Sequence, residues 1–109
     1  MSSVVQITKD NFASEVQGAP TPVLLDFGAE WCQPCKKLAP VVESLAQRYN
    51  GKLKVGYVDV GTSGQSLAME YRVMSVPTLL FFKKGQVVRQ VVGARSAEEL
   101  DQLVQEVLT

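Results

Sequence analysis

The sequence predicts an α/β domain in which a mixed five-stranded sheet is flanked by four helices. Strand-length apolar runs alternate with segments of helical periodicity, and this alternation favours parallel strands covered by helices on both faces. Two further strands are joined by a tight turn at Lys84 and Gly85, which adds an antiparallel hairpin. The 109 residues contain no repeat, linker or low-complexity tract. We therefore expect one domain spanning 1–109.

The first two elements are short. Val4 to Ile7 is an apolar run that predicts a strand. Either Thr8 or Asp10 can cap a helix directly after it. In that helix, Phe12 and Val16 are four residues apart and share one face.

The next two elements are longer and are separated from the first helix by the breaker GAPTP at 18–22. Residues 23–29 form an almost continuous apolar run, which is typical of a strand buried on both faces. Residues 34–49 change to helical periodicity, and Pro40 should kink this helix. Its apolar stripe consists of Leu38, Val41, Val42, Leu45, Ala46 and Tyr49.

The second half continues the pattern and ends with a capped helix. Residues 52–60 predict a strand, and a loop then leads to a short helix near 66–71. The hairpin follows, and Ser96 with Glu99 forms a capping box that opens the last helix, 96–108. The apolar stripe of that helix consists of Leu100, Leu103, Val104, Val107 and Leu108.

Composition and charge exclude several functional classes. Lys plus Arg and Asp plus Glu both number 11, and without a basic run the chain lacks the charge pattern of a nucleic-acid binder. The longest apolar runs are far shorter than a membrane-spanning helix. The first ten residues do not have the pattern of a secretory signal, which favours a cytoplasmic location, or an organelle interior if this is a mature cleaved form.

The only two cysteines, Cys32 and Cys35, form a C-x-x-C motif with three possible roles. A zinc site needs four ligands, and the chain has no histidine to complete one. A structural staple is a weak alternative, because so short a loop removes little entropy from the unfolded chain. A C-x-x-C motif that opens a helix after a buried strand favours a redox-active dithiol, which needs no metal and no cofactor beyond its own disulfide.

The expected positions of the cysteines give them different roles. Cys32 should stand at the N-terminal end of the helix, where unpaired N–H groups and the helix dipole favour its thiolate. Cys35 lies one turn inside and should be more buried, and it would attack a mixed disulfide on Cys32 and release the substrate. Pro34 stiffens the turn between them.

Asp26 is the candidate for proton transfer. It interrupts the apolar run 23–29, where burying a carboxylate is costly, and burial would raise its pKa toward neutrality. An ordinary hydrogen-bonded core aspartate is the alternative. The strand that carries Asp26 leads directly to Cys32, so its side chain can lie beneath the dithiol, which favours a role as acid/base.

These residues resemble the thioredoxin family. The segments LLDFGAEWCQPCKKLAP, YRVMSVPTLLFFKKGQVV and VVGARSAEEL are similar to thioredoxin segments in order and spacing, and together they cover most of the chain. The resemblance implies the thioredoxin fold. It also implies that Cys32 is the nucleophile, Cys35 the resolving thiol and Asp26 the buried acid/base.

The same resemblance implies a docking surface for targets. The Val76–Pro77 bond should be cis, with Pro77 facing the dithiol and the Val76 backbone pairing with an extended target segment. Gly93 matches a small-residue loop of that surface, although a plain turn glycine is an equal alternative. The remaining expected contact residues are Trp31, Gln33, Pro34 and Ala94.

Three positions depart from the family pattern. Gln33 stands where most thioredoxins have glycine, and Gly28 stands in place of a tryptophan. Tyr57 aligns with a lysine that lies near the buried aspartate, and its phenol could replace that cation by hydrogen bonding. We expect these changes to affect redox potential and partner choice, not the class of reaction.

The sequence therefore favours a monomeric protein-disulfide reductase. No dinucleotide-binding motif is present, so electrons should come from a separate flavin- or ferredoxin-linked thioredoxin reductase and pass to disulfide-containing target proteins. One alternative is an oxidant or isomerase on the same fold, distinguished by its redox potential. The other is a binding or chaperone subunit that uses the same surface without electron transfer.

Overall fold

A computed structural model describes residues 3–109, and it confirms the predicted order of strands and helices. The predicted domain span of 1–109 also includes Met1 and Ser2, which lie outside the described residues. The strands are β1 (Val5–Gln6), β2 (Val23–Gly28), β3 (Lys54–Asp59), β4 (Thr78–Lys83) and β5 (Gln86–Val92). The helices are η1 (Ala13–Gln17), α1 (Gln33–Arg48), α2 (Gln65–Glu70) and α3 (Ala97–Leu108). Most boundaries lie within one or two residues of those expected.

The five strands form one mixed sheet in the order β1-β3-β2-β4-β5. The pairs β1–β3 and β2–β3 are parallel, whereas β2–β4 and β4–β5 are antiparallel. The predicted turn between β4 and β5 has positive φ at both Lys84 (53°) and Gly85 (81°), as a two-residue hairpin requires. All six residues of β2 are buried, so the predicted two-sided burial of this strand is confirmed.

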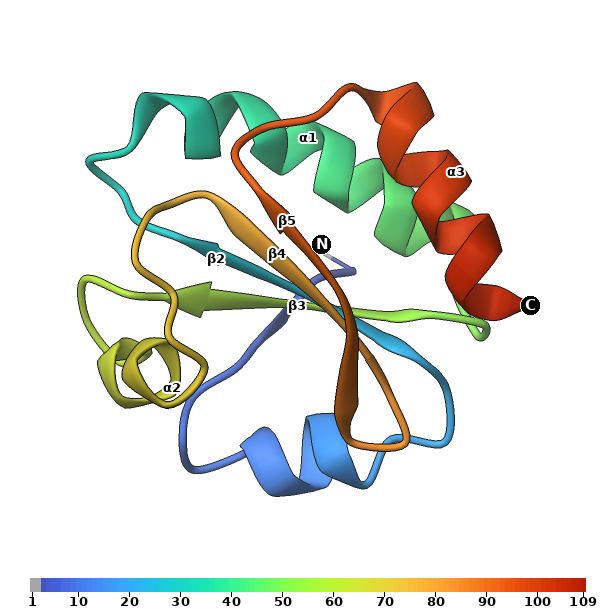
Figure 1. Cartoon of the computed structure of the whole chain (residues 1–109), viewed down its shortest axis with the longest axis horizontal. Helices are drawn as coiled ribbons and strands as arrows, with labels where there is room; N and C mark the ends of the chain where they lie inside the picture. The colour runs from blue at the N-terminus through green and yellow to red at the C-terminus, as the bar shows by residue number, and fades with distance from the viewer. Residues whose placement is uncertain (1–2) are drawn as a thin grey trace.

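Helices cover both faces of the sheet and divide the core into two layers (Figure 1). On one face, α1 and α3 pack over the sheet through apolar residues that include Leu38, Val42, Leu100 and Val104. On the other face, η1 and α2 pack against the sheet, and the rings of Phe12, Tyr71 and Phe82 meet with centroids 5.4–5.9 Å apart. No helix within residues 3–109 is long and apolar enough to cross a membrane.

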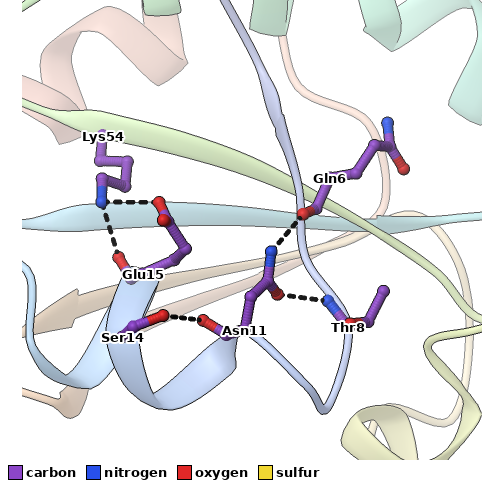
Figure 2. Close-up of polar contacts among 6 residues, drawn as sticks. All are labelled: Gln6, Thr8, Asn11, Ser14, Glu15 and Lys54. Carbon is purple, nitrogen blue, oxygen red and sulfur yellow. Dashed lines mark hydrogen bonds and ion pairs between the residues drawn. The ribbon is translucent and has the colours of Figure 1, made fainter.

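The capping expectations have opposite outcomes at the two ends of the chain. Ser96 and Glu99 form the predicted capping box of α3. At the other end, the expected cap by Thr8 or Asp10 is wrong, because η1 is a single π-helical segment without a side-chain cap. The Asn11 side chain instead fixes the segment between β1 and η1. Asn11 Oδ1 accepts from the Thr8 N–H at 2.8 Å, and Nδ2 donates to the Gln6 carbonyl at 2.9 Å (Figure 2).

Figure 2 also shows how η1 is fastened to the sheet. Lys54, at the start of β3, donates from Nζ to the Glu15 carboxylate at 2.9 Å and to the Glu15 carbonyl at 3.1 Å. This ion pair is partly exposed, so its free-energy contribution is modest. Its structural effect is to fix η1 beside β3, at the end of the sheet opposite the turn into α1.

Candidate active site

The two cysteines lie where β2 gives way to α1, and they are joined by a disulfide. Cys32 is the N-cap of α1, with extended backbone, and the Cys35 N–H donates to Cys32 Sγ at 3.2 Å. Pro34 occupies the first turn of the helix, where its missing N–H costs no hydrogen bond, as the sequence predicted. Cys32 therefore stands at the positive end of the helix dipole with a backbone donor directed at its sulfur.

The two cysteines are equally buried, contrary to our expectation that Cys35 would be more buried. Each is 5% exposed. The reason is that Val60 and Val76 pack against the small cluster that the cysteines form with Ala29. The difference between the two sulfurs thus comes from their positions on the helix: Cys32 caps it, while Cys35 lies inside its first turn.

A second segment faces the disulfide from the start of β4. The Val76–Pro77 peptide bond is cis, as the family resemblance implied, and the Val76 carbonyl oxygen lies 3.8 Å from Cys32 Sγ. Gly93, in the loop after β5, donates its N–H to the Pro77 carbonyl at 2.8 Å. The structure thus brings Cys32, Val76, Pro77 and Gly93 together at one end of the sheet.

Gly93 is a glycine because of its backbone conformation. Its φ is 89°, which side chains rarely adopt, whereas the nearest atom that a Cβ would meet is the flexible Arg95 Nη1, at 3.4 Å. Ala94 follows in the same loop and is exposed. The positive φ of this turn is therefore enough to explain why residue 93 is a glycine, and no contact with a target is needed.

Asp26 is buried on β2 at 2% exposure. Burial raises the pKa of its carboxyl from 3.8 to about 7, and its Oδ1 has no hydrogen-bond partner among the described residues. Gly28 is two residues further along the strand, so the two share a face of the sheet. A Cβ on Gly28 would lie 3.4 Å from Cys35 Cβ, which places this face of β2 against Cys35.

Tyr57 is opposite Asp26 in the register of β2 with β3, so the predicted proximity is confirmed. The suggested direct hydrogen bond from the phenol to Asp26 does not form, since Asp26 Oδ1 is unpaired and no bond to Tyr57 is present in the described part of the chain. The tyrosine ring extends over Gly28 instead: a Cβ there would lie 3.0 Å from Tyr57 Cε1 and 3.1 Å from its hydroxyl.

An apolar groove of about 350 Å³ adjoins the disulfide on the side of Trp31 and Val76. Trp31 is 71% exposed and Met74 is 91% exposed, so large apolar side chains face solvent here. Sequence reasoning predicted Trp31 and Val76 but missed the others, which are Val60, Val73, Met74 and Ser75. The run VMSV at 73–76, directly before Pro77, was the available signal, because apolar residues gathered in an exposed segment indicate a binding surface.

The remaining predicted contact residues are exposed beside this groove. Gln33 and Pro34 are both exposed in the first turn of α1. Within residues 3–109, no group of three or more His, Cys, Asp or Glu side chains is arranged to hold a metal ion. What the described geometry supports is chemistry at the two sulfurs.

Comparison with known proteins agrees with this geometry. The family model described as Thioredoxin matches residues 3–106. Thioredoxin C-2 of Corynebacterium nephridii is 48% identical over 99 residues, 91% of each chain. Thioredoxin 1 of Nostoc sp. is 45% identical over 105 residues, 96% of this chain and 97% of the relative. The bifunctional thioredoxin reductase/thioredoxin of Mycobacterium leprae is 40% identical over 96 residues, 88% of this chain and 21% of that protein.

These matches span almost the whole chain and include the segment that carries the disulfide. The fold inferred from the order of elements, the C-x-x-C motif at the start of a helix and the cis proline opposite it are thus found together in a chain with close relatives. The chain belongs to the thioredoxin family of thiol–disulfide oxidoreductases.

Proposed function

We propose that this protein reduces disulfides in other proteins, with Cys32 as the nucleophile and Cys35 as the resolving thiol. One observation carries the assignment: Cys32 caps α1 and its sulfur accepts the Cys35 N–H at 3.2 Å. A charge-assisted hydrogen bond and the positive end of the helix dipole both favour a thiolate over a thiol at this sulfur. Cys35, inside the first turn, lacks that N-cap position and suits the second step.

The reaction has two exchange steps. The Cys32 thiolate attacks one sulfur of the target disulfide, a Cys32–target disulfide forms, and the other target sulfur leaves as a thiolate. Asp26 then accepts the Cys35 proton, and the Cys35 thiolate attacks Cys32 Sγ. The Cys32–Cys35 disulfide forms and the second target sulfur leaves. The target gains two electrons, and its two thiolates take protons from solvent and, through solvent, from Asp26.

Asp26 suits the proton transfer because its pKa is raised to about 7 by burial. A group with that pKa is present in both protonation states near neutral pH, so it can accept a proton in one step and release it later. The position of Gly28 against Cys35 Cβ, on the same face of β2, supports a location of Asp26 close beneath the resolving cysteine.

The target would dock as an extended segment across the end of the sheet. The backbone of the half-buried Val76, next to Cys32 Sγ, can pair with that segment as an added strand. Trp31 and Pro34 contact it from the α1 side, Pro77 faces the dithiol, and Gln33, Gly93 and Ala94 complete the rim. The groove between Trp31 and Met74 would receive an apolar side chain of the target.

Electrons would return from a separate thioredoxin reductase, either flavin- or ferredoxin-linked. The fusion of the two activities named in the Mycobacterium leprae relative supports a reductase of this kind as the partner. We further propose that residues 1–109 act as one domain and as a monomer, because the groove beside the disulfide must stay open to targets. A reducing compartment such as the cytoplasm would help to keep Cys32 and Cys35 in the reduced, dithiol form.

Insulin-disulfide reduction tests this proposal. The protein with a thioredoxin reductase and its electron donor should reduce insulin in many turnovers, and Cys32→Ser should abolish the activity while Met69→Ala keeps it. A redox titration in parallel should give a midpoint of roughly −270 mV, the value typical of thioredoxins. A midpoint near about −120 mV, or turnover without Cys32, would contradict the proposed reductase function.

A further inference from the structure

Three polar side chains cross the sheet in a row from its edge to its centre. Gln6 on β1 is opposite Tyr57 on β3, and Tyr57 is opposite Asp26 on β2. Directly opposed residues in neighbouring strands point to the same face. Along this row exposure falls stepwise, since Gln6 is exposed, Tyr57 is half-buried and Asp26 is buried. The row therefore leads from solvent to the carboxyl group that the proposed mechanism uses.

A cavity of about 240 Å³ follows the same row. Asp26, Tyr57, Gln6 and Glu43 contribute its polar lining, and the other lining residues are Val4, Ala39 and Val42. Gln6 gives only its carbonyl oxygen to Asn11, and its side chain extends away from that network (Figure 2). A cavity with this volume and several polar groups is suited to ordered water.

Tyr57 lines this cavity, and its hydroxyl lies on the side of Gly28, the residue that Cys35 also approaches. The hydroxyl is 3.1 Å from the position of a Gly28 Cβ, and that position is 3.4 Å from Cys35 Cβ. Burial, followed by the negative charges of nearby carboxylates, raises the pKa of Tyr57 above 10.0, so the phenol remains a donor at neutral pH. Among residues 3–109 no partner for this hydroxyl is present, as none is for Asp26 Oδ1.

We propose that Tyr57 is a positioning residue for the resolving step: its hydroxyl holds the cavity water through which Asp26 passes the Cys35 proton to solvent. This inference rests on the acid/base role proposed for Asp26. Asp26 accepts the proton as Cys35 attacks Cys32 Sγ. It then releases the proton to water bound by Tyr57 and Gln6, and the carboxylate is regenerated for the next turnover.

Few other titratable groups lie close enough to Asp26 and Tyr57 to take over the proton transfer or to change its pH dependence. Glu43, on α1, is the other titratable residue that lines the cavity, and its carboxylate accepts from the Ser3 N–H at 2.8 Å. From β4, the residue opposite Asp26 is Leu79, which does not titrate. Asp59 and Glu30 act on Tyr57 by charge and help to keep it protonated.

Single-turnover kinetics of Tyr57→Phe test the inference, because this change removes only the hydroxyl. Reduced protein is mixed with a disulfide peptide, and formation of the mixed disulfide is followed separately from release of the second peptide thiol. We expect release to slow about two- to tenfold, the effect of one hydrogen bond, and formation to slow less. The pH midpoint of release should move upward, because the Asp26 carboxylate loses a water held by a donor.

Tyr71→Phe is the matched control, since Tyr71 packs between Phe12 and Phe82 on the other face of the sheet. It should leave the release rate and its midpoint unchanged. A second variant, Ala39→Leu, narrows the cavity from α1, leaves residue 57 a tyrosine, and should also slow release. Thermal unfolding of each variant shows whether it is folded.

The outcomes separate this inference from the function on which it rests. If Asp26→Asn slows release but neither Tyr57→Phe nor Ala39→Leu does, the water held by Tyr57 has no part in the reaction and the inference is overturned. If Asp26→Asn also releases the peptide at the wild-type rate, the acid/base role of Asp26 fails and the inference fails with it. Slow release with a shifted midpoint in Tyr57→Phe, absent from Tyr71→Phe, supports it.

Discussion

Tyr57 packs so closely on Gly28 that a methyl group at Gly28 would lie 3.0 Å from Cε1 and 3.1 Å from the hydroxyl oxygen of the tyrosine. The two residues come from neighbouring strands of the sheet, β2 and β3. Both are departures from the family pattern, and the structure shows that they form one packing arrangement: the ring on β3 fills the space that a large residue on β2 would need.

This arrangement predicts energetic coupling between the two positions. Gly28→Trp in the wild-type background should lower the free energy of unfolding by about 1–3 kcal/mol, because the space is already filled. In a Tyr57→Ala background the same change should cost less, with a coupling energy above about 0.5 kcal/mol in a double-mutant cycle measured by urea denaturation. Tyr71→Ala, on the other face, should be additive with Gly28→Trp. Additivity of both pairs would contradict the arrangement.

Asp26 should give the oxidised protein a pH-dependent stability. In the folded state the Asp26 carboxyl has a pKa of about 7 and keeps its proton until the pH approaches that value, whereas its ordinary pKa of 3.8 applies in the unfolded chain. The resulting stabilisation is fully present below about pH 4 and is lost as the pH rises to about 7, a loss on the order of 4 kcal/mol. Denaturant titrations should show this slope in the wild type and a smaller one in Asp26→Asn. Equal slopes would mean that Asp26 is ionised throughout.

Much of the fold was predictable from local patterns. The buried run 23–29, the stripe of 34–49 and the capping box at Ser96 each depend on neighbours in sequence, and each was located within one or two residues. The same holds for Cys32 at the helix start. The predicted cap of the first helix was wrong. Thr8 and Asp10 carry suitable oxygens, but η1 has no side-chain cap, and the Asn11 side chain bonds back to Thr8 and to Gln6 of β1.

The features that the sequence did not predict depend on how neighbouring strands are aligned in the sheet. Nothing in the sequence near position 28 or 57 shows that a ring on one strand lies over a glycine on the next. The row of Gln6, Tyr57 and Asp26 likewise requires the alignment of three strands that are separated in sequence by helices. Met74 was missed because its loop reaches the disulfide only through the fold.

Met74 should contribute to recognition of protein targets. It is 91% exposed and lines the groove beside the disulfide, so Met74→Asp places a charge where an apolar side chain is expected to dock. We expect the rate constant for insulin reduction to fall about threefold or more, and that for a small disulfide to stay within about twofold. Met69→Asp is the control, because Met69 is 79% exposed on α2 and outside the groove. Equal effects of the two changes would contradict a role for the groove.

Gln33 should tune the choice of target and leave the reaction intact. Its side chain is exposed on the first turn of α1, next to Cys32 and Pro34. Replacement by glycine removes one polar contact with a docked chain, so we expect rate constants with different protein targets to change unequally, by about two- to tenfold. Stopped-flow measurements with two unrelated targets would detect this. Identical rate constants before and after the change would make Gln33 a neutral substitution.

The most direct test of the central claim is trapping of the mixed disulfide. Cys35→Ser keeps the nucleophile at the start of α1 and removes the resolving thiol, so incubation with a disulfide target should accumulate a covalent adduct through Cys32 that a reductant such as dithiothreitol releases. Cys32→Ser should give little adduct under the same conditions, because Cys35 has no N-cap position to favour its thiolate. Mass spectrometry of the digested adducts identifies the linked residue. An adduct on Cys32 alone is the predicted result, and comparable adducts through Cys35 in the Cys32→Ser variant would contradict the assignment of the two roles.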